Sequence, residues 1–308
     1  MNLPQTILTG TDYSDISFQA LRVAGHLAQS WPARLVALHV IDRSELEDLR
    51  AQVDISEETV LERAQPQLDK SVRQMAGPEV NVETELIIGH PFAEILQAAE
   101  RTGAGLLVLG AHGSGSERDR TGTLATRCVR KAPLPVLLVR ENQDFPFRRI
   151  TACVDFSETS REALLAAVLF ARKENAALDI LHVRRPPVPG FGDSAVPSGF
   201  SVFDIPLPPY QDASEYVAHQ EQLFSEFLKP VEHALEGVAW NRHSLEDLNP
   251  AQAMAAFLRD SGSSVVVLGT RGRTGLRNLL LGSTAEKIIH RAPCSVLAIK
   301  PAGFEFQI

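Results

Sequence analysis

An internal repeat constrains the fold of this chain more than any other feature of its sequence. The segment ILTGTDYSDISFQAL, which begins at Ile7, returns as ITACVDFSETSREAL, which begins at Ile150. Later in each half, LLVLGAHGSG from Leu106 matches VVVLGTRGRT from Val265. Each repeat unit is about half of the chain, which is the size of a whole domain, whereas solenoid repeats span about 20–50 residues. The sequence therefore predicts two domains of the same fold.

The second half is longer than the first. Leu106 and Val265 are further apart in the sequence than Ile7 and Ile150, so residues have been added between these matched segments, after Val183. The best candidate is the segment RRPPVPGFGDSAVPSGFSVFDIPLPPY, within an insertion over 184–213. Its prolines are incompatible with a regular helix or a central strand, which predicts a long surface loop. Loops of this length are often functional.

Short apolar runs alternate with segments of helical periodicity in both halves. The runs lie near 6–11, 34–41, 80–88, 105–110 and 135–140, and again near 149–154, 177–183, 238–244, 263–269 and 294–300. Strands so apolar, alternating with helices, are typical of a parallel sheet covered on both faces. We predict an α/β fold of two tandem doubly wound domains, 1–143 and 147–308. The charged segment RENQDFPFRR would link them.

Charge and composition exclude several classes of partner. A net charge of −8 and a pI of about 5.6 give no general attraction to nucleic acid or to an anionic membrane. The N-terminus does not read as a signal peptide, and no apolar run is long enough to span a membrane. The three cysteines have no metal-ligand spacing and are too few for a disulfide framework. We expect a soluble cytoplasmic protein without a metal site.

Polar residues follow two strands of the second half at the point where each strand ends. In an open parallel sheet, ligands bind beyond the carboxyl ends of the strands. Asp155 follows the first strand of this half and can accept hydrogen bonds from ligand hydroxyl groups. The neighbouring Ser157 or Glu158 would cap the next helix. Gly269 and Gly272 follow the fourth strand, so we expect both segments at one edge of the sheet.

The segment after the fourth strand has the features of an anion site. Glycines let main-chain N–H groups approach an anion without a Cβ in the way. The following GSTAEKIIH resembles a helix N-terminus, where the amides of Gly282, Ser283 and Thr284 would point toward the same anion. Arg271, Arg273 and Arg277 would add positive charge, although a basic surface loop is the alternative interpretation. Phosphate is the expected ligand.

The combined pattern resembles the nucleotide-binding signature of the universal stress protein family. It consists of Gly269, two residues, Gly272, nine residues and then Gly282-Ser283, together with Asp155. The resemblance covers almost the whole chain as two tandem copies, and the layout is most similar to the bacterial tandem type E group. It implies an open five-stranded parallel sheet of order 3-2-1-4-5 in each domain, as in adenine nucleotide alpha hydrolase-like folds. It also implies a role in the stress response with bound ATP, with or without Mg²⁺.

The resemblance implies site residues by position. Asp155 would lie near the adenosine and Val183 would frame the adenine through its main chain. The other implied contacts in the second half are Cys153, Leu268, Gly269, Arg271, Gly272, Gly282, Ser283 and Thr284.

The first half departs from the signature. Only eight residues separate Gly113 from Gly122, and Glu117 and Asp119 bring negative charge into that loop. A weaker second site is therefore expected, formed by Asp12, Val40, Gly110, Gly113, Gly122 and Thr123. The alternative is a purely structural copy, whose glycines only shape the turn.

No catalytic residue is predicted. The chain lacks a Gly-Lys dipeptide for a P-loop and a G-x-S-x-G nucleophile elbow. His39 and His182 occupy equivalent places in the second strands and are expected to be structural. The leading hypothesis is an ATP-binding regulatory protein that holds nucleotide mainly in its C-terminal domain. The alternatives are slow ATP hydrolysis and a scaffold that binds an apolar or lipid-like ligand under the proline-rich insertion.

The last strands of the two halves, PVLLVR and SVLAIK, bear on assembly. They would lie at sheet edges in the implied order, and exposed apolar edges need a partner. We expect these strands to pair with each other within one chain. A further homodimer is left open, and a regulatory role requires a protein partner that the sequence does not identify.

Overall fold

The structure is a computed structural model that describes residues 3–112, 121–141, 145–186, 213–272 and 281–304. The first half contains β1 (Thr6–Gly10), α1 (Asp15–Ser30), β2 (Arg34–Asp42), α2 (Arg43–Gln52), α3 (Glu57–Ala76), β3 (Val82–Gly89), α4 (Pro91–Thr102), β4 (Leu106–Gly110), α5 (Thr123–Lys131) and β5 (Val136–Val139). The second half contains β6 (Arg149–Cys153), α6 (Glu158–Glu174), β7 (Ala177–Arg184), α7 (Ala213–Leu228), a 3₁₀ turn (Lys229–Val231), α8 (Glu232–Leu235), β8 (Trp240–Glu246), α9 (Pro250–Asp260), β9 (Val265–Gly269), α10 (Ser283–Arg291) and β10 (Ser295–Ile299).

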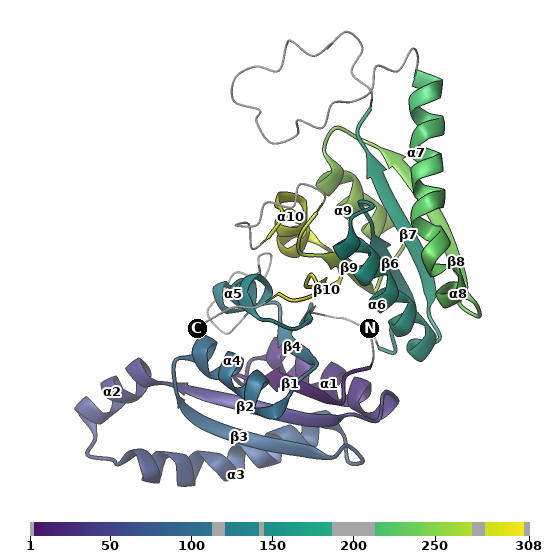
Figure 1. Ribbon diagram of the computed structural model, residues 1–308. Coiled ribbons are helices and arrows are strands. Elements are labelled where there is room, and N and C mark those ends of the chain that lie inside the picture. The colour runs from purple at the N-terminus through teal and green to yellow at the C-terminus, as the bar shows by residue number, and fades with distance from the viewer. Residues whose placement is uncertain (1–2, 113–120, 142–144, 187–212, 273–280, 305–308) are drawn as a thin grey trace, which may run out of the picture.

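All these strands form one sheet in the order β3-β2-β1-β4-β5-β10-β9-β6-β7-β8 (Figure 1). Counted from its own first strand, each half has the order 3-2-1-4-5 and is parallel throughout. The halves meet where β5 and β10 pair antiparallel, with Leu138 opposite Val296. The expected pairing of the last strands is therefore confirmed. Because of this pairing, the two predicted open sheets are one continuous sheet.

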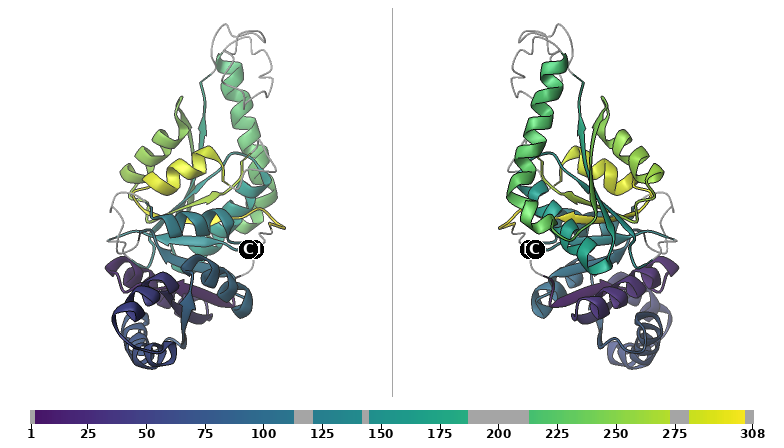
Figure 2. Two further views of the ribbon diagram at one scale, coloured as in Figure 1. Left: turned by 90° about the vertical axis from the view of Figure 1, so that its left-hand side faces the viewer. Right: turned by 90° about the vertical axis from the view of Figure 1, so that its right-hand side faces the viewer.

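Helices cover both faces of this sheet. The core on one face includes residues of α1, α3, α6 and α7. The core on the other face includes residues of α4, α5, α9 and α10. Figure 2 shows α9 and α10 on the side of the sheet opposite α7. Both cores run across the junction, where the rings of Trp31 and Phe170 meet edge to face at 4.5 Å.

Local signals start several of these helices. Ser14 and Ser157 are the N-caps of α1 and α6, and each hydroxyl accepts a hydrogen bond from the main-chain N–H three residues later, at 3.3 and 3.2 Å. The capping role predicted for Ser157 is confirmed. Pro91 is the first residue of α4, a position where proline is favoured because its missing N–H group would have no intrahelical acceptor. Among the described residues, no helix has the length and apolar character needed to cross a bilayer.

The insertion of the second half lies largely outside the described residues, which omit 187–212. The loop predicted there stays a prediction. The helix α7, which begins at Ala213 shortly after the proline-rich segment, was not predicted from the sequence.

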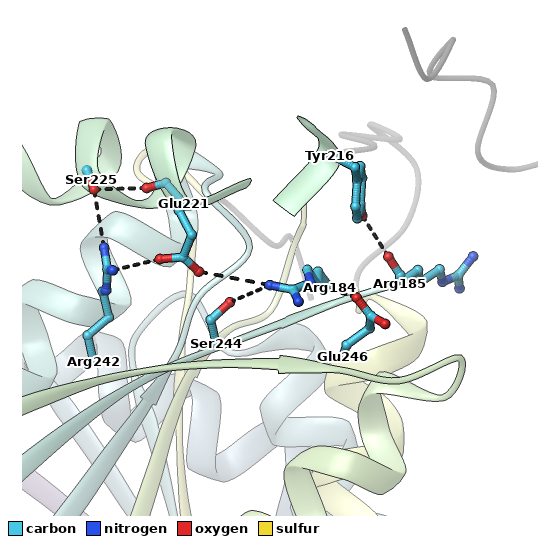
Figure 3. A network of polar contacts seen from close by, with 8 residues as sticks. All are labelled: Arg184, Arg185, Tyr216, Glu221, Ser225, Arg242, Ser244 and Glu246. Carbon is cyan, nitrogen blue, oxygen red and sulfur yellow. Dashed lines mark hydrogen bonds and ion pairs between the residues drawn. The ribbon is translucent and has the colours of Figure 1, made fainter. Parts of the chain in front are cut away.

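A polar network holds α7 on the edge of the sheet (Figure 3). Glu221 of α7 pairs with Arg242 at 2.6 Å and with Arg184 at 3.9 Å, so it joins the two outer strands β8 and β7. The Tyr216 hydroxyl donates to the main-chain oxygen of Arg185 at 2.7 Å. The chain is therefore anchored on both sides of the insertion.

Candidate functional site

The ends of β6 and β9 lie side by side. The two strands are parallel neighbours with Cys153 opposite Leu268, so the segments that follow them leave the same edge of the sheet. Asp155 is in the first segment and Gly272 in the second. A Cβ added to Gly272 would lie 2.6 Å from Oδ2 of Asp155. Any residue larger than glycine at this position would therefore displace the Asp155 carboxylate. The two segments lie close together at one edge of the sheet, as predicted. Gly269 is similarly restricted, because its Cβ would lie 2.8 Å from the Thr159 methyl group.

The segment after β9 is closed by a main-chain hydrogen bond. The Gly282 N–H donates to the carbonyl oxygen of Thr270 at 2.8 Å, and the Thr270 N–H donates to Ile299 at the end of β10 at 2.9 Å. A Cβ on Gly282 would lie 4.0 Å from the main-chain nitrogen of Gly272. The two glycine segments are thus brought together at the start of α10, although 273–280, including Arg273 and Arg277, lie outside the described residues.

The first turn of α10 begins without a side-chain cap. Its N-cap is Gly282, which offers no side-chain cap, in contrast to the serine caps of α1 and α6. The leading N–H groups of a helix have no intrahelical acceptor and carry partial positive charge. Ser283 and Thr284, at the start of this turn, add two hydroxyl groups. The buried hydroxyl of Thr270 also has no hydrogen-bond partner among the described residues. Thr270 was not among the predicted contacts, although its position between Gly269 and Arg271 was a signal in the sequence.

The Asp155 carboxylate is held in one orientation. Its Oδ1 accepts hydrogen bonds from the Ser157 N–H at 3.1 Å and hydroxyl at 2.6 Å, which leaves Oδ2 toward Gly272. The next residue, Phe156, has a φ of +65°, and its counterpart Tyr13 has a φ of +62°. A bulky residue in this left-handed region costs about 1–2 kcal/mol. The same strained turn therefore follows the first strand of both halves, and an aromatic residue after each aspartate was the overlooked signal.

The two strand histidines are hydrogen-bonded to the main chain. His182 Nδ1 lies 2.8 Å from the Val154 carbonyl oxygen, and His39 Nδ1 lies 2.7 Å from that of Thr11. A carbonyl only accepts, so Nδ1 carries the proton in both rings. Phe156 stacks on His182 with the ring centroids 4.1 Å apart. These contacts agree with the structural role expected of both histidines.

Three other predicted contacts form an apolar floor. Cys153, Val183 and Leu268 lie in or at the ends of β6, β7 and β9, and each is at most 8% exposed. Burial raises the pKa of the Cys153 thiol to about 12, so it stays protonated at neutral pH. A ligand would meet the main chain of these residues. Among the described residues, no group of three or more His, Cys, Asp or Glu side chains is arranged to hold a metal ion.

The first half repeats the main-chain anchors. The Gly122 N–H donates to Ala111 at 2.7 Å, and the Ala111 N–H donates to Val139 at 2.9 Å. Its shorter loop therefore closes with the same hydrogen bond. In place of Arg271 it carries His112, whose Nε2 lies 3.5 Å from a carboxylate oxygen of Glu141. The remaining described contacts are placed correspondingly: Asp12 after β1, Val40 in β2, Gly110 at the end of β4 and Thr123 at the start of α5. Gly113 lies outside the described residues.

Comparisons with known proteins give one consistent family. The family model described as the universal stress protein family matches residues 4–140 and 146–300. A universal stress protein of Methanocaldococcus jannaschii is 35% identical over 144 residues, which cover 46% of this chain and 84% of the relative. A universal stress protein E homolog of Haemophilus influenzae is 24% identical over 262 residues, with 79% of this chain and 77% of the relative covered.

Solved structures show the same fold over nearly the full length. A universal stress protein from Archaeoglobus fulgidus superposes with a TM-score of 0.63 at 22% identity, covering 96% of this chain and 98% of the other. A functionally unknown protein from Pseudomonas aeruginosa superposes with a TM-score of 0.68 at 18% identity, covering 97% and 93%. The tandem arrangement of two similar halves is thus shared with known structures.

Proposed function

The chain belongs to the universal stress protein family, and on this premise we propose that it binds ATP at the carboxyl ends of β6 and β9. The observation that carries the proposal is the meeting of three segments at Gly272. This glycine lies against the Asp155 carboxylate on one side and near Gly282, at the start of α10, on the other. A hydroxyl acceptor and a helix N-terminus are thereby combined in one place, as ribose and phosphate recognition requires.

Each part of the nucleotide has a proposed partner. Asp155 accepts hydrogen bonds from the ribose hydroxyl groups. The amides of Ser283 and Thr284 donate to phosphate oxygens, with the hydroxyls of the same two residues, and Arg271 supplies positive charge. The Gly282 N–H, which was also expected to point toward the anion, instead donates to the Thr270 carbonyl oxygen. The first turn of α10, which has no side-chain cap, and the Thr270 hydroxyl, which has no hydrogen-bond partner in the described part of the chain, support this fit. The adenine lies over the apolar floor, next to the main chain of Val183.

We propose the C-terminal half as the main site. Both halves have a closing hydrogen bond and a strand-end aspartate, but only the second carries an arginine at the second position after its fourth strand, Arg271. His112, at the matching position of the first half, is almost fully buried beside Glu141. A phosphate group therefore meets less positive charge in the first half. Mg²⁺ would enter with the phosphates and keep several waters, as is usual for this ion.

The proposed role is regulatory, in the stress response. Nucleotide joins the segment after β9 to the start of α10, and this changes the surface offered to a protein partner. No catalytic residue is assigned.

Extraction of the purified full-length chain tests this function. ATP or ADP released on denaturation and identified by chromatography, together with saturable ATP binding in calorimetry, is the expected result. An apolar molecule in the extract and no heat of ATP binding would favour the scaffold alternative instead. Release of inorganic phosphate from ATP, compared with and without Mg²⁺, distinguishes a binding protein from a slow hydrolase.

A further inference from the structure

Phe304, just after the last strand, lies beside two cations. The guanidinium carbon of Arg271 is 5.3 Å from the centroid of its ring, and Nζ of Lys300 is 4.7 Å from the same point. Both distances are within the range of a cation–π interaction. One aromatic ring therefore holds the arginine of the proposed phosphate site next to the lysine that ends β10.

The main chain fixes the position of this ring. The Phe304 N–H donates to the Pro301 carbonyl at 3.1 Å, which closes a turn in which Gly303 has a φ of +69°. The Glu162 carboxylate on α6 lies close to the main-chain N–H of Ala302. The position of this turn in the second half therefore does not depend only on the contacts of Phe304 with Arg271 and Lys300.

Lys300 also reaches across to the first half. Its side chain is buried, and Nζ donates to the main-chain oxygen of Val129 near the C-terminal end of α5. A cation at the end of a helix stabilises it through the helix dipole. The other end of α5 begins after Gly122, which closes the loop of the first half. Lys300 therefore connects the second half to the helix of the first-half site.

A reciprocal contact runs in the opposite direction. Arg140, which follows β5, donates from Nη2 to the carbonyl oxygen of Ile289 at 2.8 Å, near the C-terminal end of α10. The Thr121 hydroxyl donates to the same oxygen at 2.7 Å. Lys300 of the second half thus binds the end of α5, and Arg140 of the first half binds the end of α10. Each of these two helices starts at the proposed anion loop of its own half.

From this geometry we propose that Phe304 is a positioning residue of the nucleotide site, which holds Arg271 beside Lys300 so that an anion bound at Arg271 is sensed at α5 of the first half. The proposal rests on the proposed function and adds to it a link between the two sites. It assigns Phe304 and Lys300 no direct contact with nucleotide.

The electrostatics around Lys300 support this link. Burial, and then the positive charge of Arg271, lower the pKa of Lys300 from its ordinary value of 10.5 to about 7. Cys128 faces it from α5 and is neutral, because burial raises the pKa of this thiol to about 12. Among the described residues, no carboxylate pairs with Lys300.

A bound anion changes this balance in a definite direction. Negative charge at Arg271 offsets its repulsion of the ammonium group, so the pKa of Lys300 rises. Near pH 7, where this lysine is partly deprotonated, nucleotide binding is then accompanied by uptake of a proton. The positive charge that Lys300 regains strengthens the contact of its Nζ with the C-terminal end of α5.

Calorimetry of the chain with ATP at about pH 7, in PIPES and in Tris buffer, tests the proposal. The two buffers differ in ionisation enthalpy, so the difference in binding heat measures proton uptake. We expect the wild type to take up a larger fraction of a proton than Lys300→Met, and this comparison cancels the ionisation of ATP itself. Equal uptake in the two proteins would overturn the proposal.

Phe304 is tested by a matched pair of substitutions. Phe304→Leu removes the aromatic ring and should weaken ATP binding about threefold to tenfold, whereas Phe304→Tyr should retain the wild-type affinity. Circular dichroism checks the fold of both variants. Unchanged affinity in Phe304→Leu would remove the positioning role while leaving the proposed function intact. Absence of ATP binding by the wild type would instead refute the proposed function itself.

Discussion

Gly272 lies so close to Asp155 that a Cβ on the glycine would be 2.6 Å from Oδ2 of the carboxylate. This contact joins two segments that are far apart in the sequence, one after the first strand of the C-terminal half and one after the fourth. It also explains why glycine, and no larger residue, stands at this point of the loop. The nucleotide site that we propose depends on it.

Gly272→Ala should reduce ATP affinity about tenfold or more. The added methyl group forces the Asp155 carboxylate out of its place, and a hydrogen bond to a charged group is worth about 1.5–3 kcal/mol. Gly282→Ala, in the same site, should weaken binding less, because its Cβ would meet the Thr270 oxygen at an ordinary contact distance of 3.7 Å. Isothermal titration calorimetry compares the two. Similar losses of affinity in both variants would contradict the special role of Gly272.

Ser157→Ala should lower both stability and ATP affinity. Loss of the N-cap of α6 costs about 1 kcal/mol of unfolding free energy, and Asp155 loses the hydroxyl that orients it. Ser14→Ala removes the equivalent cap of α1 and should cost similar stability with little effect on affinity, if the C-terminal half is the main site. Urea denaturation and calorimetry measure the two effects. An equal fall of affinity in both variants would argue against this assignment.

His26→Leu should destabilise the junction of the two halves by about 2 kcal/mol. His26 Nε2 lies 2.8 Å from Glu174, whose side chain is 1% exposed, and the second oxygen of this carboxylate has no partner among the described residues. Adding Glu174→Gln removes the buried charge and should recover part of the loss. Urea denaturation of the single and double variants gives the coupling. Additive effects, within about 0.5 kcal/mol, would show that the pair does not act as a unit.

Lys300 should make stability depend on pH above neutrality. The unfolded chain keeps this proton up to the ordinary pKa of 10.5 and the folded chain only up to about 7. The unfolded state therefore binds more protons between these values, and the free energy of unfolding rises with pH. Urea denaturation from about pH 7 to about pH 9 should give a steeper rise for the wild type than for Lys300→Met. Parallel pH profiles would mean that Lys300 is charged in the folded protein.

The arrangement of strands could be predicted because it is encoded locally. Apolar runs such as 263–269 and 177–183 correspond to β9 and β7 to within two residues at each end. The internal repeat then transferred each assignment from one half to the other. The helix α7 has no such support, since it follows a proline-rich segment without a counterpart in the first half. Its packing depends on contacts such as Glu221 with Arg242, which join segments distant in sequence.

The candidate site was predictable to a similar extent. Parallel strands leave the sheet at one edge, which brings Asp155 and Gly272 together without knowledge of any side chain. The contacts of Arg140 with Ile289 and of Lys300 with Val129 were not predictable. They depend on the angle at which the two halves meet across β5 and β10, and no local pattern encodes that angle.

The central claim, that ATP binds in the C-terminal half through Asp155, is tested most directly by titrating ATP into Asp155→Asn and Asp12→Asn. Both substitutions preserve size and leave a side-chain oxygen to accept from the following serine. Calorimetry should show affinity reduced about tenfold or more in Asp155→Asn, and close to that of the wild type in Asp12→Asn. Wild-type affinity in Asp155→Asn would contradict the account.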